Sequence, residues 1–284
     1  MHLTYAERSQ AFPSRIVCLS DEASEVLYLL GEQDRIVGVS GFSRRPPEVR
    51  SKPRVSTFRD ANFEAIEKLD PDLIITYSDV QAGITKEAIH RGFPVLNFNQ
   101  RSVAEIFEFI QLMARMVNQQ EKGSRLIAAY QSELEKIARA ADAFGWRPRV
   151  FFEEWNDPLI SGIAWVEELI ELAGGEPIFP EFRRTQKAKD RIVQPEQLIQ
   201  RNPEVIIASW CGIKVNTNAI CSRPGWDAIA AVRNGHVYEI PSSLILQPGP
   251  ASLTEGIREL HRILGVVTLD ASPHSNRGST SPSR

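Results

Sequence analysis

The chain has 284 residues, of which 42% are hydrophobic and 24% are charged, and its formal net charge is −3. These are ordinary values for a globular protein, and the slightly acidic balance argues against a general affinity for nucleic acid. No apolar run reaches the roughly 18 residues that a membrane-spanning helix needs, so we expect no such helix.

The first part of the chain alternates short apolar strands with helices. Strands are expected at 15–19, 35–39, 73–77 and 94–98, and helices at 22–30, from Asn62 and at 85–91. This alternation predicts an α/β lobe with a parallel sheet. From Ser102, apolar residues recur at steps of three and four, which indicates two successive helices. The second covers about 121–144 and would extend roughly 36 Å, so we expect it to join two lobes as a stiff spine.

The α/β pattern restarts after Pro148. Strands are expected at 149–153, 205–208 and 235–240, and helices at 164–173, 195–201 and 252–264. The predicted fold class is therefore α/β, with two similar parallel-sheet lobes joined by a single long helix. The expected boundaries are a tail at 1–14, a first lobe at 15–118, an inter-lobe helix at 119–145, a second lobe at 146–267 and a disordered tail at 268–284.

An internal repeat supports two similar lobes. Asn62–Tyr77 aligns with Gln194–Ser209, and each copy reads as a short amphipathic helix, an Asx-Pro break, an acidic residue and a buried strand. Two lobes create a cleft, which is where small ligands bind. Each copy carries a glutamate at the same place, Glu64 and Glu196. Such a carboxylate favours the helix macrodipole, and the symmetric pair also suits docking onto arginines of a two-fold symmetric partner.

The sequence lacks the usual signatures of catalysis and of metal binding. It contains no glycine-rich phosphate loop, no Gly-x-Ser-x-Gly and no paired histidine spacing. The three cysteines, Cys18, Cys211 and Cys221, cannot all pair, so no disulfide framework is expected. We therefore expect no enzyme activity, no cofactor and no metal held by the protein alone.

Aromatic and polar residues gather in the segments that follow the expected strands, which is where doubly wound sheets bind ligands. Phe58, Trp155 and Trp210 suit a flat, partly apolar ligand of large area. The alternative is that each ring packs beneath its own loop. The polar groups expected to meet the edges of the ligand are Arg44, Arg59 and Gln247. Cys211 is either a thiolate that contacts a soft metal centre of the ligand or a buried thiol beside Trp210.

These residues resemble the periplasmic vitamin B12-binding protein family, the substrate-binding components of ABC importers of the iron-siderophore and B12 type. The resemblance spans about 15–264. Its most specific stretches are Arg15–Ser20, Arg35–Ser40, Val55–Phe58, Leu69–Ile75, Asp157–Gly162 and Ala173–Gly175. The resemblance implies two lobes joined by one long helix, a ligand held between them and no catalysis.

The resemblance also implies roles for individual residues. Glu64 and Glu196 match the glutamates with which such proteins dock on permease arginines. The positions that match the family's ligand cleft are Phe42, Phe58, Leu159 and Ile160. The sequence departs from the family near Asp190, where a tryptophan is expected, and at Trp155 and 210–212, which indicate a distinct subgroup.

The leading hypothesis is a monomeric, non-enzymatic protein that captures cobalamin for an ABC permease. One alternative in the same fold is a ferric-siderophore or haem binder. An alternative from another class is a cytoplasmic enzyme or chaperone that handles corrinoids. The resemblance implies a periplasmic location, but the first ten residues lack a secretory signal pattern. The sequence therefore leaves a cytoplasmic location or an upstream start open.

Overall fold

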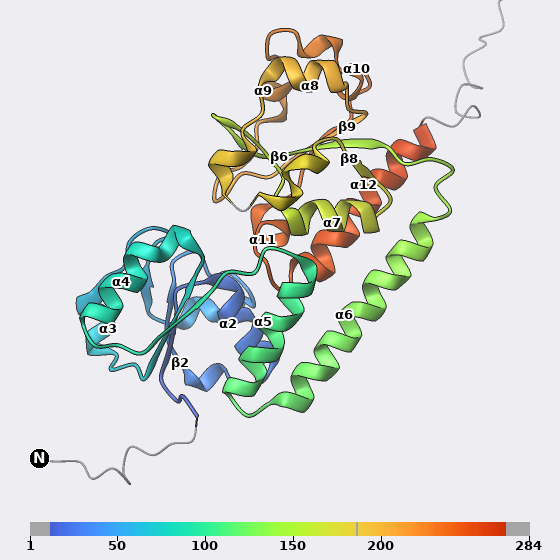
Figure 1. The fold of residues 1–284 in the computed structure, drawn as a ribbon. Coiled ribbons are helices and arrows are strands. Elements are labelled where there is room, and N and C mark those ends of the chain that lie inside the picture. Colours follow the sequence, from blue (N-terminus) through green and yellow to red (C-terminus); the bar gives the residue numbers. More distant parts are fainter. Residues whose placement is uncertain (1–11, 186, 271–284) are drawn as a thin grey trace, which may run out of the picture. The chain divides into compact units, whose positions relative to one another are not determined.

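The computed structural model describes residues 12–185 and 187–270, and these form two compact units (Figure 1). Unit 1 holds the described residues up to Tyr130 together with Gln247–Pro250. Unit 2 holds Gln131–Leu246 and the described residues from Ala251 onward. Most of the predicted tails, at 1–14 and 268–284, lies outside the described residues.

Unit 1 is built on a five-stranded sheet with the order β3-β2-β1-β4-β5, in which every pairing is parallel. Its strands are β1 (Ile16–Cys18), β2 (Ile36–Ser40), β3 (Arg54–Ser56), β4 (Leu73–Tyr77) and β5 (Val95–Phe98). The central strands β1 and β4 are buried along their whole length, as their continuous apolar sequences predict. The order reverses between β1 and β4, which is where ligands bind in doubly wound sheets.

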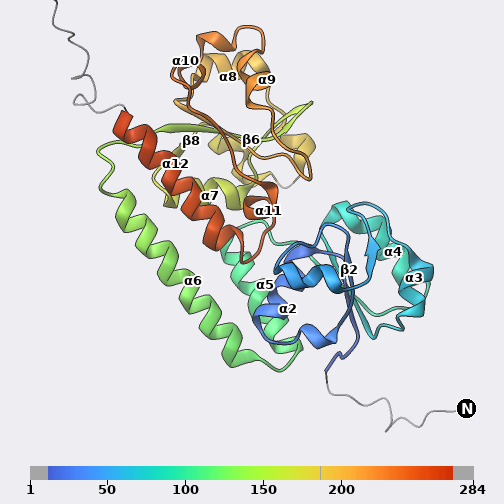
Figure 2. The same cartoon turned by 180° about the vertical axis from the view of Figure 1, so that it is seen from behind.

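Helices cover both faces of this sheet. They are α2 (Asp21–Leu29), α3 (Phe63–Lys68), α4 (Ala82–His90) and α5 (Val103–Met116). Helices α3 and α4 lie on one face and α2 and α5 on the other (Figures 1 and 2). Helix α5 begins with a capping box, in which the Glu105 amide donates to Ser102 Oγ over 3.2 Å and the Ser102 amide donates back to the Glu105 carboxylate over 3.1 Å.

The predicted long helix is α6 (Gln120–Ala141). It begins in unit 1, crosses the unit boundary after Tyr130 and ends in unit 2. Its first turns pack closely in unit 1, because a Cβ built on Gly123 would lie 2.4 Å from the Cβ of Ala114 in α5. The chain is therefore continuous and helical where it passes from one unit to the next.

Unit 2 has a second sheet, with β10, β9, β6 and β7 in order and β8 also paired with β6. Its strands are β6 (Arg149–Asn156), β7 (Leu159–Ser161), β8 (Glu176–Pro177), β9 (Val205–Ala208) and β10 (Val237–Glu239). The pairing of β6 with β7 is antiparallel, and the other pairings are parallel. The predicted class of two parallel-sheet lobes is confirmed, and β7 adds one antiparallel pairing because the turn at Asp157–Pro158 folds the chain back along β6.

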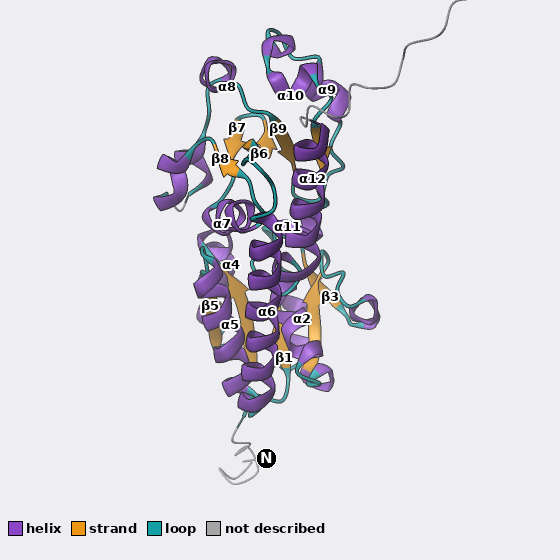
Figure 3. Ribbon diagram, turned by 90° about the vertical axis from the view of Figure 1, so that its right-hand side faces the viewer, coloured by secondary structure: helices purple, strands orange, loops and turns teal. Residues whose placement is uncertain are grey.

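The remaining helices of unit 2 follow α6 along the chain. They are α7 (Ala164–Leu172), α8 (Pro195–Arg201), α9 (Thr217–Cys221), α10 (Ala230–Arg233), α11 (Ser242–Ile245) and α12 (Ile257–Asp270). Helix α7 packs against α12 (Figure 2), and Figure 3 shows the helices in purple beside the orange strands. Since α12 continues to Asp270, the expectation that a disordered tail begins at residue 268 is wrong.

One short segment departs from the predicted division of the chain. Gln247–Pro250, hereafter the strap, belongs to unit 1 by its contacts, although the residues on either side of it belong to unit 2. The Gln100 side chain donates to the carbonyl oxygen of Pro248 over 3.0 Å. Gly249 packs on α2, since a Cβ there would lie 2.6 Å from the Cβ of Glu22. The sequence had placed the whole strap in the second lobe.

Candidate functional site

In unit 1, two of the aromatic residues predicted to contact the ligand follow neighbouring strands at the same edge of the sheet. Ser40 at the end of β2 pairs with Ser56 at the end of β3, and the Gly41 amide donates to the Ser56 carbonyl over 2.8 Å. Phe42 and Phe58 each come two residues after these paired serines. Phe42 is half-buried, whereas Phe58 is 38% exposed. The structure therefore brings both rings to the carboxyl ends of adjacent parallel strands.

Buried polar groups support the loop that carries Phe42. The Phe42 amide donates to Ser40 Oγ over 3.1 Å, and Ser43 Oγ donates to Asp21 Oδ1 over 3.2 Å. Gln247 of the strap donates to the other Asp21 oxygen over 2.5 Å. Burial raises the pKa of Asp21 to about 6, although hydrogen bonds from serines and the charge of Arg44 oppose the rise. The Gln247 side chain is thus already hydrogen-bonded to Asp21, a partner that the sequence did not predict.

The two predicted arginines of unit 1, Arg44 and Arg59, are both exposed. Arg44 lies close enough to Asp21 for its charge to act on that carboxyl group. Arg59 directly follows the exposed ring of Phe58. Each cation thus follows one of the two aromatic loops and is open to solvent, where an anionic group of a ligand could reach it.

In unit 2, three predicted contact residues belong to one hairpin. Trp155 lies in β6 and pairs with Ile160 of β7, and its indole nitrogen donates to the Asp157 carbonyl over 2.9 Å. The Trp155 ring is partly buried, and Leu159 and Ile160 are 8% and 9% exposed. The expectation that these residues stand in a loop is wrong, because β6 continues past Phe152 and turns into β7.

Trp210 is part of the core of unit 2. Its side chain is 7% exposed, and its indole nitrogen donates to Glu153 Oε1 over 3.1 Å. Glu153 is fully buried, and Arg223 binds both of its carboxylate oxygens, over 2.6 and 2.8 Å. Burial raises the pKa of Glu153, while Arg223 and Trp210 oppose that rise. This placement favours the alternative in which the Trp210 ring packs beneath its own loop.

Cys211 follows Trp210 but is exposed, so the alternative of a buried thiol at this position is wrong. The other two cysteines differ from it, because Cys18 is buried in β1 and Cys221 is half-buried at the end of α9. Burial raises the pKa of the Cys18 thiol far above its ordinary value, and the charge of Glu22 adds to that rise. Cys211 is therefore the cysteine open to solvent.

Glu64 and Glu196 are both exposed, and each lies in the first turn of a short helix, α3 or α8. Within 12–185 and 187–270, neither carboxylate has an ion-pair partner. The next acid of α3 differs, since Arg91 binds Glu67 over 2.8 Å and lies over the Phe63 ring at 4.9 Å. Both predicted docking carboxylates are therefore available to an external cation.

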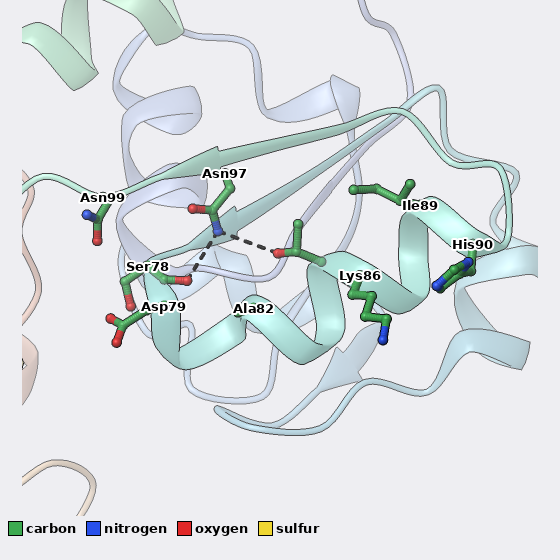
Figure 4. Close-up of a pocket in the computed structure, with 9 residues that line it drawn as sticks. Ser78, Asp79, Ala82, Lys86, Ile89, His90, Asn97 and Asn99 are labelled. Carbon is green, nitrogen blue, oxygen red and sulfur yellow. Dashed lines mark hydrogen bonds between the residues drawn. The ribbon is translucent and has the colours of Figure 1, made fainter.

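A shallow hollow of about 530 Å³ lies elsewhere on unit 1, between α4 and the edge strand β5 (Figure 4). Asn97 lies in the wall of the hollow. Its side-chain nitrogen donates to the Ser78 carbonyl over 3.3 Å and to Thr85 Oγ1 over 3.5 Å. Lys86, Ile89 and His90 of α4 also line the hollow. None of the predicted contact residues does, so this hollow is separate from the aromatic edge, by which we mean the end of the sheet that carries Phe42 and Phe58.

Neither a metal-binding cluster nor a membrane-spanning helix occurs among the described residues. Across 12–185 and 187–270, no three His, Cys, Asp or Glu side chains stand close enough to hold a metal ion. No helix in the same residues combines the length and the apolar character that crossing a bilayer requires.

The comparisons with known proteins agree on one family. A profile described as periplasmic binding protein matches residues 16–244. The chain is 26% identical to an uncharacterized ABC transporter substrate-binding lipoprotein of Bacillus subtilis, over 87% of this chain and 79% of that protein. It is also 26% identical to the vitamin B12-binding protein of Vibrio vulnificus, over 88% of this chain and 90% of the relative. Among solved structures, the periplasmic heme-binding protein RhuT of Roseiflexus superposes with a TM-score of 0.77 at 21% identity, covering 90% and 99% of the two chains.

Proposed function

Because this chain belongs to the periplasmic binding protein family, we propose that it captures cobalamin and delivers it to an ABC importer. The relatives and the α/β fold with its two sheets support a substrate-binding protein of the B12, haem and siderophore type. The choice of cobalamin rests on the Vibrio vulnificus relative, which matches nearly the whole length of both chains. In this proposal the protein binds its ligand without chemical turnover and works outside the cytoplasmic membrane, as the names of its relatives indicate.

The proposed contacts in unit 1 are those that the structure leaves open at the aromatic edge. Phe58 presents the most exposed ring and Phe42 the neighbouring one, and apolar ring faces supply large contact areas to a flat ligand. Arg44 and Arg59 meet amide or phosphate groups at the rim of the ligand. Gln247 acts through Asp21 and the Phe42 loop, because its amide is already bound there.

The proposed contacts in unit 2 are Trp155 and the apolar side chains of Leu159 and Ile160 at the same hairpin. We do not include Trp210, because its ring is buried and its nitrogen binds Glu153. Cys211 is exposed at the end of β9 and is retained as a residue near the ligand. These residues are the proposed ligand contacts within unit 2.

Haem is the second candidate, and the match to RhuT favours it. Haem iron in proteins takes an axial ligand from His, Tyr, Met or Cys. The described histidines are not among the proposed contacts: His90 lines the hollow, His236 is 8% exposed and His261 stacks on Phe144. A corrinoid that brings its own axial ligands has no such need, whereas haem would have to take its axial ligand from another residue, such as the exposed Cys211.

Delivery to an importer is proposed to use Glu64 and Glu196, one on each copy of the repeat. Their exposed carboxylates suit arginines on a symmetric permease, and such contacts set partner choice and encounter rate. Uptake of labelled cyanocobalamin by cells or proteoliposomes with the cognate permease should fall when both are changed to alanine, while the Kd for cyanocobalamin stays unchanged. Unchanged uptake in the double variant would refute the docking role.

The ligand itself is tested by equilibrium dialysis against cyanocobalamin, haem and a ferric hydroxamate siderophore. We expect cyanocobalamin to bind most tightly and Phe58→Ala to weaken it about tenfold or more, since burying an aromatic face contributes roughly 1.5–3 kcal/mol. Leu112→Ala in α5 is the matched control, because Leu112 is exposed and lies outside the aromatic edge. Preference for haem, with a Soret band that changes in Cys211→Ser, would instead establish the second candidate.

A further inference from the structure

The loop that carries Phe58 is tied to the centre of the sheet by one buried amide. Gln81, at the end of the short 3₁₀ turn Asp79–Gln81, is 2% exposed. We propose that Gln81 is the positioning residue of the ligand site, which holds the Phe58 loop in its binding conformation. This inference rests on the proposed function, because it takes Phe58 as a ligand contact.

Gln81 uses both ends of its side-chain amide. Its Oε1 accepts the backbone amide of Tyr77 over 2.9 Å, and its Nε2 donates to the Leu19 carbonyl over 2.9 Å. Nε2 also donates to the Phe58 carbonyl over 3.4 Å. Three chain segments therefore meet at one side chain: the end of β4, the end of β1 and the loop after β3.

The place of this side chain in the fold explains why it matters. Strands β1 and β4 are the neighbours between which the strand order reverses, and ligands bind beyond the carboxyl ends of the strands at that point. Gln81 joins the two ends there and extends the link to Phe58. A buried side-chain amide whose oxygen and nitrogen are both hydrogen-bonded fixes the relative positions of the chain segments that it binds.

The chain turns sharply to bring Gln81 back to this position. Ser78 directly after β4 has a φ of 58°, which a residue with a Cβ rarely adopts. Its hydroxyl accepts the Val80 amide over 3.2 Å, and its own amide donates to the Phe98 carbonyl. Backbone in sparsely populated conformations concentrates at ligand sites, where the surrounding structure maintains it. The strained turn and the buried amide thus serve the same edge of the sheet.

The Phe58 loop has its own internal bonds, and Gln81 connects it to the centre of the sheet. Thr57 donates its amide to the Asp60 carbonyl over 2.8 Å, and the Asp60 amide donates to Thr57 Oγ1 over 3.1 Å. The Asn62 amide also donates to the Val55 carbonyl over 2.8 Å and closes the loop onto β3, so Gln81 adds the link to the ends of β1 and β4. The Gln81 bond to Phe58 is the longest of its three and thus the weakest. The Phe58 loop is therefore the part that moves first when the amide is altered.

The test combines Gln81→Met, which keeps the length of the side chain and removes the three bonds, with Phe58→Ala. Cyanocobalamin is the probe, and Kd is measured by calorimetry for the wild type, both single variants and the double variant. We expect Gln81→Met to weaken binding about threefold to tenfold. In the Phe58→Ala background it should have no further effect, because the residue through which it acts is gone. Gln131→Met, at an exposed glutamine of α6, is the matched control.

A second readout needs no ligand. Hydrogen exchange at 57–60 should become several-fold faster in Gln81→Met, while exchange in β6 and β9 stays at the wild-type rate. If Gln81→Met does not fold, Gln81→Glu replaces it, since that variant keeps the acceptor for Tyr77 and loses the donor to Leu19 and Phe58. Losses in Kd that add in the double variant, or unchanged exchange at 57–60, would overturn the inference. If the wild type does not bind cyanocobalamin but exchange at 57–60 is faster in Gln81→Met, the positioning role is supported and the proposed ligand is refuted.

Discussion

Glu22 offers a test of the electrostatics beneath the aromatic edge. The side chain is 3% exposed, and its Oε1 has no hydrogen-bond partner within the described residues. Burial raises the pKa of Glu22 from 4.5 to about 8, and the nearby charges of Asp21 and Glu25 add to the rise. The folded protein therefore holds this carboxyl group protonated at neutral pH, whereas the unfolded chain ionises it.

The sign of the pH dependence follows from this difference. Below pH 4.5 both states are protonated, so the contribution of Glu22 to stability is fully present. Between pH 4.5 and about 8 the folded state binds more protons, and the free energy of unfolding falls by about 1.4 kcal/mol per pH unit. Glu22→Gln cannot ionise. Relative to the wild type, the variant should gain about 3 kcal/mol between pH 5.5 and 7.5.

The distribution of tryptophans makes the assay specific. All five tryptophans belong to unit 2, so their fluorescence in a urea titration follows that unit. Hydrogen exchange in β1 and β4 follows unit 1 and should show the gain in Glu22→Gln. The matched control is Glu167→Gln in α7, because Glu167 is 2% exposed and burial raises its pKa to about 8 as well. A difference between Glu22→Gln and the wild type that does not change with pH would refute the reasoning.

Two further changes probe unit 2. Arg223→Met leaves the Glu153 carboxylate buried without its cation, so the free energy of unfolding, followed by fluorescence, should fall by about 3–5 kcal/mol. Adding Glu153→Gln should restore part of this loss. A loss below about 1 kcal/mol in Arg223→Met would contradict the burial argument. Cys211→Ser should leave the absorption spectrum of bound cyanocobalamin unchanged, whereas a shifted spectrum would show that the exposed thiol reaches the cobalt.

Local signals predicted most of the fold. The repeat at Asn62 and Gln194 identified a helix and a buried strand in each unit, namely α3 with β4 and α8 with β9. The three- and four-residue steps identified α5 and α6. These predictions succeed because the signals lie within short windows of sequence, where apolar periodicity and capping residues decide the local structure.

The errors concern contacts between distant parts of the chain. Trp210 packs in the core of unit 2, where its indole N–H donates a hydrogen bond to Glu153, 57 residues earlier. Gln247 is engaged by Asp21, 226 residues away, which places the strap in unit 1. The β7 strand is only three residues long, so it leaves too short a pattern to recognise. No local window contains the partners of Trp210 or Gln247, and the roles of Gln81 and Asp21 were missed because they too depend on distant contacts.

The measurement that tests the central proposal most directly is a calorimetric titration of the folded protein with cyanocobalamin. The proposal predicts saturable binding of one cyanocobalamin per chain, weakened in Phe58→Ala and unchanged in Leu112→Ala. Absence of binding by a protein that remains folded through the titration would contradict it.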